Sequence, residues 1–160
     1  MLPEPLADDK LAVALENRLP GAITGVQTPV DGPVPVVSGP FILDVCRFLK
    51  ENGFEQLSGV TGVDWWPRAP RFEVIYLLRS IRKNRRLRLV VPLDEKEELE
   101  SVTPVWRGAN WYEREVFDLF GIPFRHHPNL DRIMMPADWE GHPLRKDYPI
   151  HGHKYSYQDE

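Results

Sequence analysis

A chain of 160 residues is long enough to bury one hydrophobic core and corresponds to about one domain. Its net charge of −4 argues against nucleic acid as a partner, because phosphate binding usually requires a basic excess. Cys46 is the only cysteine, which excludes an internal disulfide, a thiolate zinc site and an iron–sulfur cluster held by four cysteines.

The N-terminal residues predict a helix followed by two short strands. Leucines recur every four residues from Leu11 to Leu19, which places them on one helical face, and two aspartates before them suit a helix N-terminus. A Pro-Gly pair at residues 20–21 breaks the pattern. Residues 22–37 then combine β-type residues with prolines and an Asp-Gly step, so we expect two short strands around a turn.

A second helix is expected between Ser38 and Gly53. Ser38 can act as its N-cap, and Pro40 suits the first turn. Gly53 can adopt the left-handed conformation that ends many helices. The apolar residues of this segment share one face and are Phe41, Val45, Phe48 and Leu49.

Residues 54–66, 71–78 and 85–91 predict three strands of a meander. The middle segment is apolar at nearly every position, which a strand covered on only one face would not need, so we expect it to lie centrally in the sheet. In the third segment arginines alternate with leucines, so one face should pack on the core and the other should be basic. We expect this third strand nearer a sheet edge.

A third helix is predicted over residues 108–120, ending at Gly121. Its core-facing stripe consists of Ala109, Tyr112, Val116, Leu119 and Phe120. Arg114 and Asp118 should face away from the core and pair with each other, because they lie one turn apart. Trp111 and Phe117 fall outside the stripe, so either the tail of the chain or a partner protein must cover them.

Residues 121–160 form a C-terminal segment, which we call the arm. It holds five prolines and no sustained helical or strand period. A structureless segment of this length is either disordered or held against a surface, and its aromatic and large apolar residues favour the second possibility. We therefore predict a core domain over residues 1–120 and an ordered, extended arm over residues 121–160.

All the histidines lie between His126 and His153. His142, His151 and His153 could together hold a metal ion, but they match no zinc-enzyme motif, so we favour a role in packing along the arm. If Glu113 is buried, it needs a hydrogen-bond donor, and Arg132 and Arg145 of the arm are the candidates. In that case Glu113→Ala should loosen the arm and raise its protease sensitivity.

The sequence does not indicate nucleophilic catalysis, nucleotide binding or RNA binding. No serine or cysteine nucleophile is spaced with a matching histidine, and there is no glycine-rich nucleotide-binding motif. The basic residues between Arg79 and Arg88 lack the exposed aromatics of RNA-binding sheets, so a solvated or protein-docking face is favoured. We also expect neither a secretion signal nor a membrane span, since no apolar run approaches about eighteen residues.

The segments YEREVFDLFGIPFRHHPNLDRIMMP and DWEGHPLRKDYP resemble the signature region of the 30 kDa-type subunit of respiratory complex I, the NADH:quinone oxidoreductase. GVDWW and PRFEVIYLL resemble the same family, so the likeness covers about residues 54–150. Asp131 departs from the pattern, because a basic residue is more usual there.

The resemblance implies a single α+β domain with a mixed β-sheet and helices packed on it, plus a long C-terminal arm that lies on the large quinone-site subunit. It also implies that this chain holds no cofactor, with FMN and iron–sulfur clusters in partner subunits. The expected function is that of a non-redox scaffold that holds the quinone-reducing module to its neighbours. It would lie at the cytoplasmic face of the bacterial membrane, bound only through the complex.

None of the residues is expected to be catalytic, cofactor-binding or metal-binding. Those expected to organise the arm and its interface are Trp111, Glu113, Arg114, Phe117, Asp118, Arg132, Trp139, Arg145, Lys146, Asp147 and Tyr148. Truncation after Gly121 should abolish assembly while leaving the sheet domain folded. The alternatives are the equivalent subunit of a ferredoxin-fed or hydrogenase-type membrane complex, and a small metalloenzyme built on the histidines.

Overall fold

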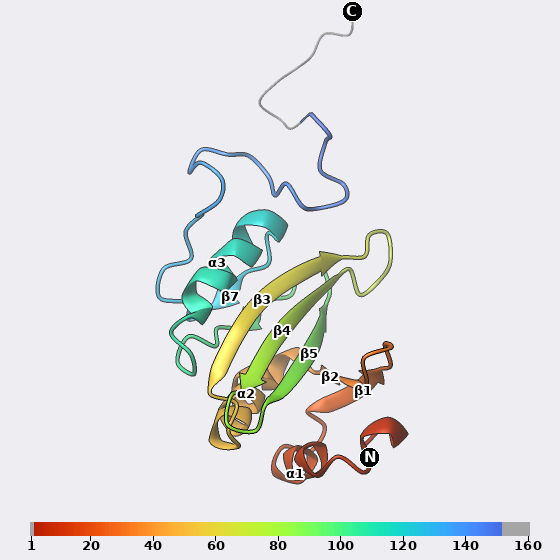
Figure 1. The fold of residues 1–160 in the computed structure, drawn as a ribbon. Coiled ribbons are helices and arrows are strands. Elements are labelled where there is room, and N and C mark those ends of the chain that lie inside the picture. The colour runs from red at the N-terminus through yellow and green to blue at the C-terminus, as the bar shows by residue number, and fades with distance from the viewer. Residues whose placement is uncertain (1, 152–160) are drawn as a thin grey trace, which may run out of the picture.

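A computed structural model describes residues 2–151 of the chain (Figure 1). The fold is α+β with a mixed sheet, as the resemblance implied. In chain order the elements are η1 (Glu4–Leu6), α1 (Lys10–Arg18), β1 (Ile23–Gln27), β2 (Val34–Val37), η2 (Gly39–Phe41), α2 (Ile42–Glu51), β3 (Gln56–Asp64), β4 (Phe72–Ser80), β5 (Arg85–Leu93), β6 (Leu99–Glu100), α3 (Ala109–Phe120) and β7 (Phe124–Arg125).

The main sheet has five strands in the order β1-β2-β5-β4-β3. The predicted meander is confirmed, because β3, β4 and β5 pair antiparallel in succession. β4 lies between two long strands, as expected. β5 occupies the middle of the sheet, so its predicted position near an edge was wrong. The reason is that β2 pairs with β5 in parallel, at Val36 and Val90, and no local pattern reveals such a long-range pairing.

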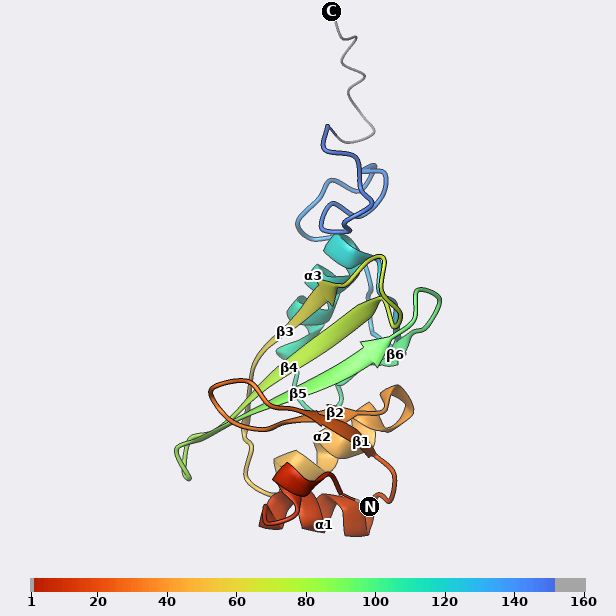
Figure 2. The ribbon, with the colours of Figure 1, turned by 90° about the vertical axis from the view of Figure 1, so that its right-hand side faces the viewer.

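The helices cover only one face of this sheet. Phe72, Val74, Tyr76 and Leu78 of β4 point into the core and are buried. On the opposite face Leu77 is 39% exposed, so the nearly continuous apolar run of β4 does not reflect burial on both faces. In Figure 2 the strands β3, β4 and β5 lie side by side in front of α3.

The first two helices follow their sequence signals with one exception. Asp9 caps α1, since its carboxylate accepts the N–H of Leu11 at 2.8 Å, and Leu15 is buried. Ser38 makes no side-chain capping bond, so its predicted role as N-cap was wrong. The residues after it form η2, and α2 begins only at Ile42.

The end of α2 matches the prediction. Gly53 has φ +94° and donates its N–H to Lys50 O at 3.1 Å, while Phe54 donates to Leu49 O at 3.0 Å. This pair of hydrogen bonds satisfies carbonyls that the helix end would leave open. A residue with a side chain would be strained at the φ angle of Gly53.

α3 packs closely on β3 because Gly62 has no side chain. A Cβ atom at this position would lie 2.8 Å from the ring of Phe120. The first residues of the arm continue this core, since Ile122 and Phe124 are both buried and β7 pairs in parallel with β6. Residues 126–151 form no helix or strand and cross the end of α3 (Figure 1).

None of the helices in residues 2–151 is long and apolar enough to cross a membrane.

Candidate functional site

Asp118 fastens the arm to α3. Its Oδ2 atom accepts three consecutive backbone N–H groups, those of Ile133, Met134 and Met135, at 3.1, 2.7 and 2.9 Å. Its Oδ1 atom accepts a hydrogen bond from Arg132 at 2.6 Å. Asp118 is fully buried by these contacts, so the prediction that it faces away from the packed side and pairs with Arg114 was wrong.

The hydrogen bonds keep this carboxylate charged. Burial alone would raise the pKa of Asp118, because a low-dielectric environment disfavours the anion. The three backbone N–H groups and Arg132 outweigh that effect, and they hold the pKa below its ordinary value. Asp118 is therefore an ionised anchor for the arm at neutral pH.

The arm also caps the C-terminus of α3. Arg132 and His142 both hydrogen-bond to the carbonyl oxygen of Asp118, at 3.1 and 2.9 Å. Leu144 donates its N–H to Leu119 O at 3.0 Å, and Arg145 donates from Nε to Phe120 O at 2.6 Å. The last helical carbonyls thus all have donors, and two of these donors are arginines placed at the negative end of the helix dipole.

This capping requires Gly121. Its φ of +75° is the left-handed conformation, and a Cβ there would lie 2.5 Å from the ring of His142. The same ring lies edge-on to Phe117, with 6.0 Å between centroids. Burial lowers the pKa of His142, which favours the neutral ring in this packed position.

A second attachment joins residues 146–147 of the arm to the loop between β3 and β4. Arg71 donates from Nε and Nη2 to the carboxylate of Asp64, at 3.1 and 2.9 Å, and both of these residues are buried. Nη2 and Nη1 of Arg71 also reach Asp147 in the arm, at 2.6 and 3.1 Å. The backbone N–H of Lys146 donates to Asp64 at 2.9 Å. One buried arginine thus bonds the sheet to the arm.

Electrostatics reinforce this second attachment. The hydrogen bonds to Arg71 hold the pKa of Asp147 below its ordinary value, and those to Asp64 and Asp147 raise the pKa of Arg71. Glu95, just after β5, accepts from both Arg71 and Arg145, at 2.9 and 3.3 Å. Carboxylates and guanidinium groups therefore neutralise one another around Asp64.

Glu113 has partners other than those predicted. It is fully buried, and its two carboxylate oxygens accept from Ser101 Oγ at 2.6 Å and from Val102 N–H at 2.7 Å. Neither Arg132 nor Arg145 reaches it, because both lie at the far end of α3. Burial raises the pKa of Glu113 to about 7, although both hydrogen bonds act to lower it.

The aromatic residues outside the α3 stripe divide between two environments. The arm covers Phe117 through His142, while Trp111 stays 62% exposed. Arg114 lies over the ring of Trp111, 5.2 Å from its centroid, and donates from Nε to Asp131 O at 2.9 Å. Its predicted ion pair with Asp118 is absent from residues 2–151, since Asp118 is occupied by the arm.

The remaining predicted residues lie along the arm. Trp139 is partly buried, and its indole N–H has no hydrogen-bond partner within residues 2–151. Tyr148 donates to Glu140 O at 3.4 Å, and the ammonium of Lys146 lies 5.9 Å from the ring of Trp65. The structure thus brings Asp118, Arg132, Arg145, Lys146 and Asp147 into the two attachments, whereas Glu113, Arg114, Tyr148 and Trp139 lie outside them.

Sequence reasoning missed Asp64, Arg71 and Glu95. The available signal was an acid and a base at the two ends of a short turn, in GVDWW and PRFEV, which suits a pair across the hairpin. It also missed that several large apolar side chains stay exposed, namely Trp65, Trp66, Met134, Leu144 and Ile150, whereas Trp111 was predicted.

A metal site is not formed within the described part of the chain. Residues 2–151 contain no cluster of three histidine, cysteine or acidic side chains able to hold an ion. His153, which the metalloenzyme alternative needs, lies outside the described residues. That alternative therefore stays a hypothesis.

Comparison with known proteins gives consistent matches. Residues 36–154 match the family described as respiratory-chain NADH dehydrogenase, 30 Kd subunit. The chain is 42% identical over 146 residues to an NADH-quinone oxidoreductase subunit of Hyphomonas neptunium, covering 89% of this chain and 72% of that protein.

Solved structures share the fold. A trypsin-resistant fragment of Nqo5 has a TM-score of 0.65 and 32% identity, covering 74% of this chain and 97% of the fragment. A chain of the archaeal membrane-bound sulfane sulfur reductase, a respiratory membrane complex, has a TM-score of 0.71 at 24% identity. It covers 88% of this chain and 84% of its own length, and this likeness concerns the fold alone.

Proposed function

The chain belongs to the family of the 30 Kd subunit of respiratory-chain NADH dehydrogenase, and we propose that it is a non-redox scaffold of the proton-translocating NADH:quinone oxidoreductase. In this function it holds the quinone-reducing module to its neighbours. Its chief partner is the large quinone-site subunit, and FMN and iron–sulfur clusters lie in other subunits. The chain acts at the cytoplasmic face of the bacterial membrane and is bound there through the complex.

The observation that carries this proposal is the construction of the arm. Its inner side is fixed by the two attachments, at Asp118 and at Arg71. Its outer side exposes Met134, Leu144 and Ile150, with exposures of 57%, 51% and 98%. Several large apolar side chains exposed on one ordered segment are typical of protein interfaces.

Pre-organisation is the physical advantage of this arrangement. An extended segment normally loses conformational entropy when it binds, which weakens the association. Here hydrogen bonds within the chain already hold the backbone of residues 132–135 and 144–147 in place. The apolar side chains of the arm can then be buried against a partner with little further ordering.

Affinity purification of the tagged chain from native membranes tests this function. The wild-type chain should recover flavin- and iron–sulfur-containing subunits. Asp118→Ala should recover much less, because the arm loses its anchor, whereas Asp44→Ala changes an exposed residue of α2 and should behave as wild type. A wild-type chain recovered only as a homo-oligomer contradicts the proposal, and ferredoxin-binding or hydrogenase-type partners would place it in a related complex.

A further inference from the structure

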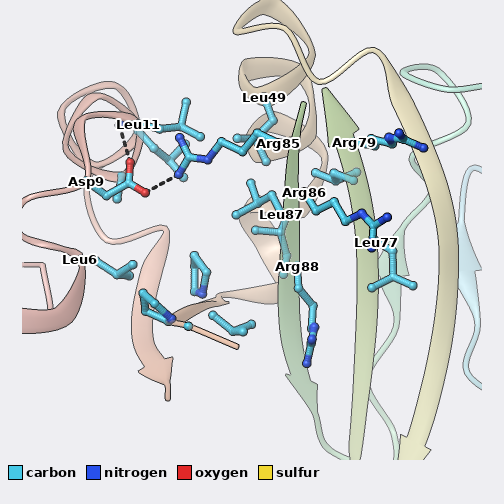
Figure 3. A pocket seen from close by; sticks show the side chains of 18 of the residues that line it. Leu6, Asp9, Leu11, Leu49, Leu77, Arg79, Arg85, Arg86, Leu87 and Arg88 are labelled. Atoms are coloured by element: carbon cyan, nitrogen blue, oxygen red, sulfur yellow. Dashed lines mark hydrogen bonds and ion pairs between the residues drawn. The ribbon is translucent and has the colours of Figure 1, made fainter. Parts of the chain in front are cut away.

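A second candidate binding site lies at the end of the molecule opposite the arm. It is a groove of about 780 Å³ between β5 and the N-terminal elements, shown in Figure 3. α1 contributes Leu11 and Leu15, the turn between β1 and β2 contributes Asp31 and Pro33, and β5 contributes residues 85–89. This volume lies within the range of specific ligand sites.

The groove exists because the main sheet is split along part of β5. On one side β5 is paired with β4 over its whole length, from Arg85 opposite Ser80 to Leu93 opposite Phe72. On the other side its pairing with β2 is confined to Val90. Within residues 2–151, residues 85–89 therefore form no ladder pair on the side of β5 that faces the groove. Such an edge readily accepts an added strand.

The rim of the groove carries uncompensated positive charge. Arg79 and Arg86 lie directly opposite each other on β4 and β5, and both are exposed. Within residues 2–151 neither side chain forms an ion pair or hydrogen bond. Like charges placed opposite each other across a ladder are destabilising. A bound anion would relieve this repulsion.

Neighbouring arginines show which anions the groove accepts. Arg85 pairs with the carboxylate of Asp9, and Arg88 pairs with that of Asp31 at 2.6 Å. Both carboxylates come from elements that flank the groove, as Figure 3 shows for Asp9 and Arg85. Side-chain carboxylates thus already bind Arg85 and Arg88, the arginines on either side of the unpaired Arg86.

Side chains along β5 alternate between the two faces of the sheet. Arg86 and Arg88 lie on the outer face, while Leu87 lies on the inner face, toward the leucines of α1. A strand placed beside this edge would meet Arg86 and Arg88 with every second side chain and, beyond Arg85, leucines with the others. Its sequence should therefore alternate acidic and apolar residues.

We propose that the groove binds an extended acidic segment of a partner polypeptide, which adds to the free edge of β5 as a strand. The unpaired backbone edge favours a polypeptide over a lipid headgroup or free phosphate, because only a polypeptide supplies the alternating N–H and C=O groups of a ladder. This site is separate from the arm and its proposed interface.

The test uses the full chain and a short blocked peptide of alternating glutamate and valine. Amide hydrogen exchange should show new protection at residues 85–89 when the peptide binds. In the double variant Arg79→Gln, Arg86→Gln the affinity should fall about tenfold, since two charge contacts are lost. Arg82→Gln removes an arginine of the adjacent turn that does not line the groove and is the matched control, with affinity unchanged.

Four further probes make the outcome decisive. A peptide with lysine in place of glutamate should not bind. This measurement uses the wild-type chain alone. Equal binding by a peptide with all glutamates before all valines would overturn the proposal, because alternation would not matter. Protection of the same amides by inorganic phosphate or by phosphatidylglycerol vesicles, or no protection by the peptide, would also overturn it.

Discussion

Arg71 donates two hydrogen bonds to Asp147, at 2.6 and 3.1 Å, although the two residues lie 76 positions apart in the sequence. The same guanidinium group neutralises Asp64, which is only 3% exposed. One side chain therefore both completes the end of the β3–β4 hairpin and holds the arm at Asp147. Together with the attachment at Asp118, this dual contact fixes the path of the arm.

Arg71→Ala should be strongly destabilising. It would leave the carboxylate of Asp64 buried without its cation, and breaking a buried pair in this way costs about 3–5 kcal/mol. Urea unfolding measures the loss. Arg47→Ala is the matched control, because Arg47 pairs with Asp44 on the surface, where such a pair contributes about 0–1 kcal/mol. Similar losses in both variants would contradict the assigned role of Arg71.

The attachment at Asp118 should depend on pH in a defined direction. The pKa of Asp118 is lowered from the ordinary value of 3.8 by the hydrogen bonds it accepts, which outweigh its burial. Its stabilising effect is therefore fully present above pH 3.8 and is lost as pH falls through the folded-state pKa. Amide exchange at Ile133, Met134 and Met135 should stay slow at about pH 5 and accelerate in strong acid. In Asp118→Asn these amides should exchange rapidly even at about pH 5.

Glu113 should produce the opposite pH dependence. Its pKa is about 7 in the folded chain against 4.5 ordinarily, so the folded state retains a proton that the unfolded state loses between these values. The free energy of unfolding should fall by about 3 kcal/mol over this window as pH rises. Glu113→Gln keeps the acceptor for Val102 and cannot ionise.

Urea unfolding at about pH 5 and about pH 8 checks this expectation. Glu113→Gln should match the wild type in the acidic buffer and exceed it in the basic one. Glu115→Gln, which removes a partly exposed carboxylate of the same helix, should change stability little in either buffer. A variant Glu113→Gln that is less stable than wild type in the basic buffer would show that the ionised carboxylate is favoured in the core.

Gly121→Ala should displace the arm from the end of α3. Alanine is strained at φ +75°, and its Cβ would collide with His142. We expect a loss of about 1–3 kcal/mol and faster proteolysis of the arm. Gly108→Ala is the control, because Gly108 has φ −63° and open space where a Cβ would be. Equal effects of the two substitutions would argue against close packing at Gly121.

Two truncations should show which residues of the arm belong to the hydrophobic core. Removal of all residues after Gly121 takes Ile122 and Phe124 out of the core, so the sheet domain should lose stability, contrary to the expectation from sequence. Removal after Arg125 keeps both and should leave a cooperative unfolding transition. Urea unfolding of the two truncated chains distinguishes these outcomes.

Local patterns predicted the longer helices and the strands β1 to β5 with most of their ends, but not η1, η2, β6 or β7. The leucine spacing of α1, the left-handed Gly53 and the alternation in β5 each express a preference over a few residues, which sequence reveals directly. The middle position of β5 depends on its parallel pairing with β2, between Val36 and Val90, and no local preference records it.

The site was predicted less completely for a related reason. Helical periodicity shows that Asp118 lies off the apolar stripe, but it does not show that three backbone N–H groups of the arm will bury it. It likewise could not show that Glu113 accepts a hydrogen bond from Ser101 and not from an arginine. Polar contacts between distant segments depend on the tertiary path of the chain.

The proposed scaffold function requires that this chain supports assembly and performs no chemistry. Its sharpest test compares membranes carrying the wild-type chain with membranes carrying Asp118→Ala, and measures NADH:quinone activity per assembled complex. We predict that the amount of assembled complex falls while the activity of each assembled complex is unchanged. A full amount of complex with reduced activity per complex would contradict the scaffold function.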